Sequence, residues 1–199
     1  MTSNSSNKIG HVAIIMDGNS RWARQRSLKT IEGHKHGVNR LRDIVRYSAK
    51  SEITHLSVFA FSTENWKRSA SDVSDLMKLF LQSIIKEVPE LIENKVQLNF
   101  IGDIPRFSKS LISQINSAVK DTQAKKPNLN LNIAISYGGR WDILNAIKRL
   151  KDQQINIDKI NEEDFSNLLS TSNFPDPDLL IRTGDEIRIS NFFLWQISY

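Results

Sequence analysis

Short apolar segments alternate along this chain with longer segments in which apolar residues recur at helical spacing. The short segments, each expected to form a strand, are residues 12–16, 56–61, 96–101, 129–136 and 179–181. Helices are expected between them at residues 38–49, 73–88, 108–122, 141–151 and 162–169, with Pro89 kinking or ending the second helix. Such alternation is typical of α/β proteins, so the chain is predicted to form a mainly parallel central sheet flanked by helices.

Composition limits the number of domains and the cellular compartment. A chain of 199 residues, 39% hydrophobic and 25% charged, is expected to form a single domain, residues 9–199, after a flexible polar N-terminus, residues 1–8. It has no cysteine, which excludes disulfides, a thiolate nucleophile and cysteine-ligated zinc. We expect a cytoplasmic protein, because residues 1–8 lack the apolar core of a signal peptide and no apolar run approaches the roughly 20 residues that span a bilayer.

Polar residues gather directly after the expected strands. In open parallel sheets ligands bind at the carboxyl ends of the strands, and four of the five strand ends here carry arginine. Arginine matches phosphate oxygens bidentately, so arginines that converge on one edge of the sheet would bind a polyanion. The net charge of +5 agrees with such a ligand, although nucleic acid and an anionic membrane surface agree with it equally well.

The first of these tracts suggests a magnesium site. Asp17 follows the first strand, Gly18 permits an unusual backbone angle, and Asn19 or Ser20 is expected to cap the next helix. The start of that helix and Arg21 together would bind an anion. A carboxylate such as Asp17 repels a phosphate unless Mg²⁺ bridges them, so we expect a magnesium–diphosphate site. The simpler alternative is an Asp-Gly-Asn turn that ends a core strand.

Five tracts in order resemble the cis-prenyltransferase family, and most closely the bacterial undecaprenyl diphosphate synthases. They are residues 11–22 (His-x-Ala-x-x-Met-Asp-Gly-Asn-x-Arg-Trp), 33–35 (Gly-His-Lys), 59–68 (Phe-Ala-Phe-Ser-Thr-Glu-Asn-Trp-Lys-Arg), 137–142 (Tyr-Gly-Gly-Arg-Trp-Asp) and 182–191 (Arg-Thr-Gly-x-Glu-x-Arg-Ile-Ser-Asn). The resemblance implies a Mg²⁺-dependent enzyme that adds isopentenyl diphosphate to an allylic diphosphate such as farnesyl diphosphate, with cis double bonds. It also implies a homodimer that touches the inner membrane surface transiently when it releases a lipid product such as undecaprenyl diphosphate.

The resemblance also assigns roles to individual residues. Asp17 would hold the Mg²⁺. Asp17 and Asn65 would both take part in catalysis. Substrate contacts are expected from the first two tracts (Gly18, Asn19, Arg21, Trp22 and His34), from the third (Ser62, Thr63, Glu64, Trp66 and Arg68) and from the last (Arg182, Arg188 and Ser190). The growing chain needs a hydrophobic tunnel beside the sheet, for which the candidates are Met77, Leu81, Ile84, Ile85, Val88, Phe100 and Ile133. Core packing explains the same apolar stripe equally well.

Some positions depart from the family pattern. Thr30 stands where relatives usually have arginine, and Asp185 and Ile187 replace a glycine and a histidine. The chain stops at Tyr199, two residues before a glutamate that the family places near its metal site. The sequence is therefore expected to be a fragment of a longer chain or a catalytically impaired protein.

Other functions remain as alternatives. The second choice is a noncatalytic subunit of a prenyltransferase complex, although such subunits typically lose the Asp-Gly-Asn tract, which is intact at residues 17–19. A nucleic-acid-binding module is a weak contender, because most aromatic residues lie in apolar runs rather than beside basic residues, and no nucleic-acid partner is expected. A P-loop hydrolase is disfavoured, since the chain has no Gly-x-x-x-x-Gly-Lys-Ser/Thr motif.

Overall fold

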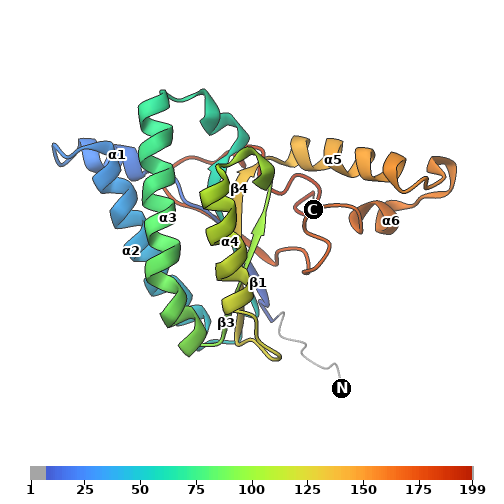
Figure 1. The fold of residues 1–199 in the computed structure, drawn as a ribbon, viewed down its shortest axis with the longest axis horizontal. Helices are drawn as coiled ribbons and strands as arrows, with labels where there is room; N and C mark the ends of the chain where they lie inside the picture. Colours follow the sequence, from blue (N-terminus) through green and yellow to red (C-terminus); the bar gives the residue numbers. More distant parts are fainter. Residues whose placement is uncertain (1–7, 199) are drawn as a thin grey trace, which may run out of the picture.

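The computed structural model describes residues 8–198, which form a parallel sheet with helices packed against it (Figure 1). The strands are β1 (His11–Ile15), β2 (His55–Ser62), β3 (Val96–Ile101), β4 (Leu129–Tyr137) and β5 (Leu179–Arg182). Their order across the sheet is β3-β4-β2-β1-β5, and every neighbouring pair is parallel. The α/β fold predicted from the alternation is confirmed, and in the described residues the sheet is entirely rather than mainly parallel.

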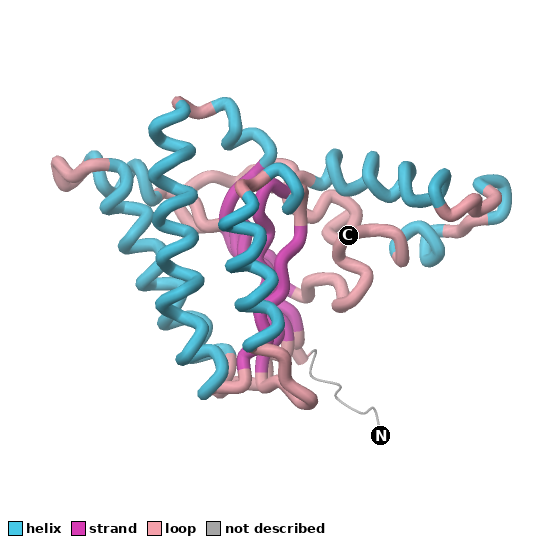
Figure 2. Tube along the Cα trace, viewed as in Figure 1, coloured by secondary structure: helices cyan, strands magenta, loops and turns pink. Residues whose placement is uncertain are grey.

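Helices cover the sheet unevenly (Figures 1 and 2). The helices are α1 (Asn19–Arg24), α2 (Thr30–Ser48), α3 (Ala70–Glu93), α4 (Lys109–Asp121), α5 (Gly139–Asp152) and α6 (Glu162–Ser166). Helices α2, α3 and α4 contribute to the larger apolar core on one face of the sheet. Phe192 and Phe193, which lie after β5, fill the smaller core on the other face, and α5 and α6 project sideways as an arm. No helix in residues 8–198 is both long enough and apolar enough to cross a membrane.

Three local predictions were wrong in whole or in part. Pro89 was expected to kink or end its helix, and the structure contradicts the second outcome, because α3 continues to Glu93. The residue that precedes α1 is Gly18 at φ 91°, and neither Asn19 nor Ser20 caps the helix, because the left-handed conformation there suits glycine. Helix α6 ends at Ser166, before the predicted limit of residue 169.

A row of buried polar groups crosses the second face of the sheet. The Nδ1 atom of His11 lies 2.6 Å from the carbonyl oxygen of Pro175, and its Nε2 atom lies 2.7 Å from Ser57 Oγ. Asn132 donates to the same Ser57 oxygen over 3.1 Å. A neutral His11 satisfies both contacts by donating to Pro175 and accepting from Ser57. Burial lowers the pKa of His11, which favours this uncharged ring.

Candidate active site

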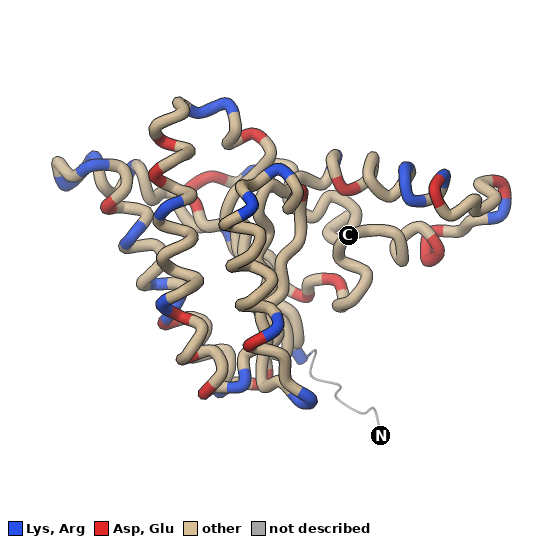
Figure 3. The backbone as a smooth tube through the Cα atoms, viewed as in Figure 1, with Lys and Arg blue, Asp and Glu red and all other residues tan. Residues whose placement is uncertain are grey.

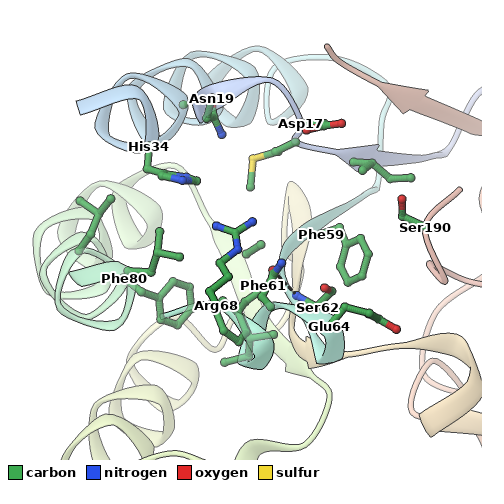
Figure 4. A pocket seen from close by; sticks show the side chains of 18 of the residues that line it. Asp17, Asn19, His34, Phe59, Phe61, Ser62, Glu64, Arg68, Phe80 and Ser190 are labelled. Carbon is green, nitrogen blue, oxygen red and sulfur yellow. Dashed lines mark hydrogen bonds between the residues drawn. The ribbon is translucent and has the colours of Figure 1, made fainter. Parts of the chain in front are cut away.

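The carboxyl ends of the strands surround one large cavity. It has a volume of about 590 Å³ and lies between the strand ends and helices α2 and α3 (Figure 4). Ten of the residues expected at the site line it: Asp17, Asn19, His34, Ser62, Glu64, Asn65, Arg68, Arg182, Arg188 and Ser190. The structure therefore brings together polar groups from four of the tracts, at the end of the sheet where the sequence predicts them.

A neighbouring cavity of about 380 Å³ shares Asp17 and Asn19 with the first. Its lining adds Gly18, Arg21 and Trp22. The Arg21 guanidinium donates to the carbonyl of Gly184 over 2.6 Å, which ties α1 to the segment after β5. Three more predicted contacts thus lie beside the main cavity rather than in its wall.

Two predicted contact residues, Thr63 and Trp66, line neither cavity. The indole of Trp66 donates to Ser136 Oγ over 2.9 Å, and its ring packs edge-on against Phe61. The Arg106 guanidinium lies 4.5 Å above that ring. The contacts of Trp66 in the structure are thus packing contacts, since its polar atom is already paired within the protein.

Asp17 stands at the centre of the polar end. Its Oδ1 accepts from the backbone N–H of Gly18 over 2.7 Å, and its Oδ2 accepts from Arg182 Nη2 over 2.7 Å. Partial burial raises the pKa of Asp17, but the bonds from Arg182 and Gly18 outweigh it and hold the pKa below its ordinary value. The carboxylate is therefore charged at neutral pH.

Arg182 links Asp17, which follows β1, to Ser190 in the segment that follows β5. Besides Asp17, it donates to Ser190 Oγ over 2.7 Å and to the carbonyl of Arg188. Its side chain is only 10% exposed, and its Nε is a buried donor with no partner in the described residues. Such a donor is costly to bury unpaired, so it suits an anion that arrives with the ligand.

His34 projects from α2 toward the same space, where the Arg68 guanidinium points at it (Figure 4). Burial lowers the pKa of His34, and the positive charge of Arg68 lowers it further. Its Nε2 has no protein partner in residues 8–198. A neutral ring with a free nitrogen at this place can donate to or accept from a ligand oxygen.

Asn191 was missed, although it ends the last of the quoted tracts. It lines the cavity at φ +63°, its Nδ2 donates to Glu64 Oε1 over 2.9 Å, and its Oδ1 accepts from the N–H of Arg140 over 3.0 Å. Partial burial raises the pKa of Glu64, but the bonds from Asn191 and Thr63 outweigh it and lower the pKa overall. Asn191 therefore joins the segments after β2, β4 and β5.

The positions that depart from the family pattern are exposed or tolerated. Asp185 has φ +63°, a left-handed conformation that aspartate adopts more readily than most residues. Ile187 is fully exposed, and Thr30 is the exposed first residue of α2.

The other end of the main cavity is apolar. Met77, Phe61 and Phe80 line it, and a third cavity of about 140 Å³, which Phe80 also lines, adjoins it. Among the tunnel candidates, Ile84, Phe100 and Ile133 line this third cavity, whereas Leu81 and Val88 pack against the core. The choice of Ile85 was wrong, because its side chain is 56% exposed and lines none of these cavities.

The carboxylates of the site can bind a cation only if the ligand supplies further oxygen atoms to it. In residues 8–198 no three His, Asp or Glu side chains form a metal-binding cluster. Mg²⁺ is commonly held by one or two carboxylates together with substrate phosphates and water. Asp17, surrounded by arginines that can bind those phosphates, fits that pattern.

Comparison with known proteins finds relatives that cover almost the whole chain. A family model described as undecaprenyl diphosphate synthase matches residues 15–199. The farnesyl-diphosphate-specific ditrans,polycis-undecaprenyl-diphosphate synthase of Legionella pneumophila (strain Paris) is 44% identical over 193 residues, which cover 95% of this chain and 81% of the relative. The enzyme with the same name from Haemophilus influenzae is 46% identical, with 95% and 80% covered.

Solved structures show the same similarity. Lavandulyl diphosphate synthase from Lavandula x intermedia, crystallised with dimethylallyl diphosphate, superposes with a TM-score of 0.89 at 37% identity, covering 94% of this chain and 83% of that one. A probable undecaprenyl diphosphate synthase from Campylobacter jejuni gives a TM-score of 0.80 at 32% identity, with 97% and 83% covered.

Proposed function

Since the chain belongs to the undecaprenyl diphosphate synthase family of prenyltransferases, we infer that it condenses isopentenyl diphosphate with an allylic diphosphate. Farnesyl diphosphate is the expected primer, and a cis-polyprenyl diphosphate such as undecaprenyl diphosphate, the lipid carrier precursor for cell-wall synthesis, is the expected product. The alternative of a noncatalytic subunit is not favoured.

One observation carries this assignment. A single cavity has a polar end, formed by Asp17, Arg182 and Ser190, and an apolar end formed by residues such as Phe80 and Met77. A polyprenyl diphosphate has the same division into a charged head and a hydrocarbon chain. Burial of that chain contributes about 0.8 kcal/mol per CH₂ group, which favours its growth away from the strand ends.

We propose that the two diphosphates bind on the two sides of Asp17. Gly18, Asn19, Arg21, His34 and Arg68 would hold the allylic diphosphate, while Arg182, Arg188 and Ser190 would hold isopentenyl diphosphate. As the allylic carbon–oxygen bond breaks, the leaving diphosphate gains negative charge that these donors stabilise. The isopentenyl double bond supplies the electron pair of the new carbon–carbon bond, and a proton is then lost.

Asp17 would hold Mg²⁺, with Asn65 nearby in the loop after β2. When bound, the ion would neutralise negative charge on the leaving diphosphate. The chain's own part is to keep Asp17 ionised and oriented, which the Gly18 and Arg182 hydrogen bonds do. Arg182 contacts both Asp17 and Ser190, so it is placed to couple the two diphosphate sites.

The test is direct. The purified chain is incubated with farnesyl diphosphate and labelled isopentenyl diphosphate, with Mg²⁺ or with EDTA, and label is measured in butanol-extractable lipid. We expect incorporation with Mg²⁺ and none with EDTA. Absence of incorporation under both conditions, by a chain shown to be folded, would contradict the proposed enzyme.

We further propose that the protein is a cytoplasmic homodimer that touches the membrane surface when product leaves. Support for a dimer comes from the projecting α5, which exposes Leu144 (60%) and Ile147 (46%). Support for membrane contact comes from Tyr47 on α2 and Ile85 on α3, which are exposed and directly neighbour Arg46 and Lys86 in the sequence. Figure 3 shows where Lys and Arg lie along the backbone. Sedimentation equilibrium and vesicle flotation would test the two proposals separately.

A further inference from the structure

Two Arg–Glu ion pairs join α2 to α3 beyond the apolar end of the main cavity. Arg42 donates through Nε to Glu87 Oε2 over 2.6 Å, and its Nη2 donates to Glu87 Oε1. Arg46 donates through Nη2 to Glu90 Oε2 over 2.8 Å, and its Nε donates to Glu90 Oε1. Both pairs are bidentate, which is the strongest and most directional form of such a contact. We call these four residues the α2–α3 clasp.

The clasp stands at the rim of the third cavity. Arg42, Glu87 and Glu90 contribute to its lining, which is otherwise mostly apolar. Met16, Val38, Ala60 and Phe80 line both this cavity and the main one, so the two cavities adjoin at these side chains. The side chains of Arg42 and Glu87 are 22% and 20% exposed, so this pair is shielded from solvent more than the other ion pairs of α2.

The volume of the third cavity limits how much hydrocarbon fits beside the clasp. An apolar cavity of about 150 Å³ holds a molecule the size of benzene. The third cavity, at about 140 Å³, therefore accommodates little more than one five-carbon unit. A chain that grows past Phe80 by further units would push against α2 and α3, which line the cavity, and the clasp opposes their separation.

We propose that the α2–α3 clasp limits product length by resisting the separation of α2 and α3. The proposal rests on the chain-elongating function proposed above. Each further unit has to be accommodated against the resistance of the ion pairs, and elongation stops where the accumulated resistance outweighs the free energy gained by burying the next unit. Arg42 and Glu87 thus determine specificity without touching the reacting atoms.

Charge reversal tests this assignment. Arg42→Glu places two carboxylates against each other and is expected to lengthen the mean product by at least one five-carbon unit. Arg42→Glu combined with Glu87→Arg restores an opposite pair, and each new charge then lies one helical turn from an attractive neighbour, Arg46 or Glu90. The double variant is expected to return products to the wild-type length.

The readout is the chain-length distribution of labelled, dephosphorylated products on reverse-phase chromatography, with farnesyl diphosphate as primer. Asp75→Asn, which breaks an exposed ion pair on the outside of α3, is the matched control and should leave the lengths unchanged. Glu87→Gln keeps the side-chain shape and should give a smaller lengthening even if the reversal variant does not fold.

Wild-type lengths from folded Arg42→Glu and Glu87→Gln, or a lengthened product that the double variant does not correct, would overturn the clasp. A wild-type chain that incorporates no label would instead contradict the proposed function itself, so the two failures are distinguishable.

Discussion

At the scale of single residues, the site depends on side chains that are held by partners far away in the sequence. Asn191 is separated from Glu64 by 127 positions, yet their side chains are hydrogen-bonded. Its Oδ1 accepts from the start of α5 at the same time. The sequence identified Asp17 and Arg182 because each follows a strand, but it showed no role for Asn191, whose contacts exist only after the three segments meet.

The hydrogen bond between Asn191 and Glu64 can be tested with two substitutions that exchange its donor and its acceptor. Asn191→Asp places a second carboxylate against Glu64, so kcat/KM should fall by about tenfold or more, which corresponds to ~1.4 kcal/mol. Adding Glu64→Gln supplies an amide that donates to Asp in place of Asn, and activity should recover. Steady-state kinetics with each diphosphate varied in turn measure the effect. If the double variant does not recover activity, the hydrogen bond between Asn191 and Glu64 does not position the site.

At the scale of secondary-structure elements, the strands were predicted closely and the helix faces less so. Apolar runs bounded by polar residues locate a buried strand to within a residue or two, as at β3, whose predicted limits match. Ile84 and Ile85 are adjacent and both apolar, and both were candidates for the tunnel, although only Ile84 shares the helical spacing of the apolar face with Val88. The structure buries Ile84 at 7% exposure and leaves Ile85 outside.

The contact between α1 and α2 depends on one glycine. A Cβ added at Gly33 would lie 2.0 Å from the backbone oxygen of Asn19, so Gly33→Ala should push the helices apart and lower the free energy of unfolding by about 1–3 kcal/mol. At Gly37 the same Cβ would meet only the Asn19 side chain, at 2.7 Å, which can move. Urea denaturation should therefore show a clear loss for Gly33→Ala and little for Gly37→Ala; equal losses would contradict the argument.

At the scale of the whole molecule, the parallel sheet and the edge proposed to bind ligands followed from the alternation of strands and helices. The size and position of the cavities did not, because they depend on how far α2 and α3 stand apart and on which side chains fill the gap. Trp66 illustrates the limit: it lies among polar loop residues, yet its indole turns inward to Ser136.

The free energy of unfolding of the whole domain should fall on acidification at pH values above those at which the carboxylates titrate. Burial lowers the pKa of His11, His34 and His55 from 6.5, so the unfolded chain binds more protons than the folded one as pH falls below that value. The contribution of these histidines to the free energy of unfolding is fully present above pH 6.5 and declines as pH falls toward their pKa values in the folded protein. Thermal unfolding at pH 7.5 and 5.5 should show the loss, and His11→Gln should reduce it; equal midpoints at both pH values would exclude this linkage.

Catalysis is expected at the carboxyl end of β1, and a matched pair of substitutions tests this most directly. Asp17→Asn changes a carboxylate at that end, whereas Asp178→Asn changes one at the opposite end, where it accepts from the N–H groups of Gly10 and His11. Incorporation of labelled isopentenyl diphosphate should fall by about 100-fold or more in Asp17→Asn and remain close to wild type in Asp178→Asn. Equal incorporation by Asp17→Asn and the wild-type chain would contradict the assignment.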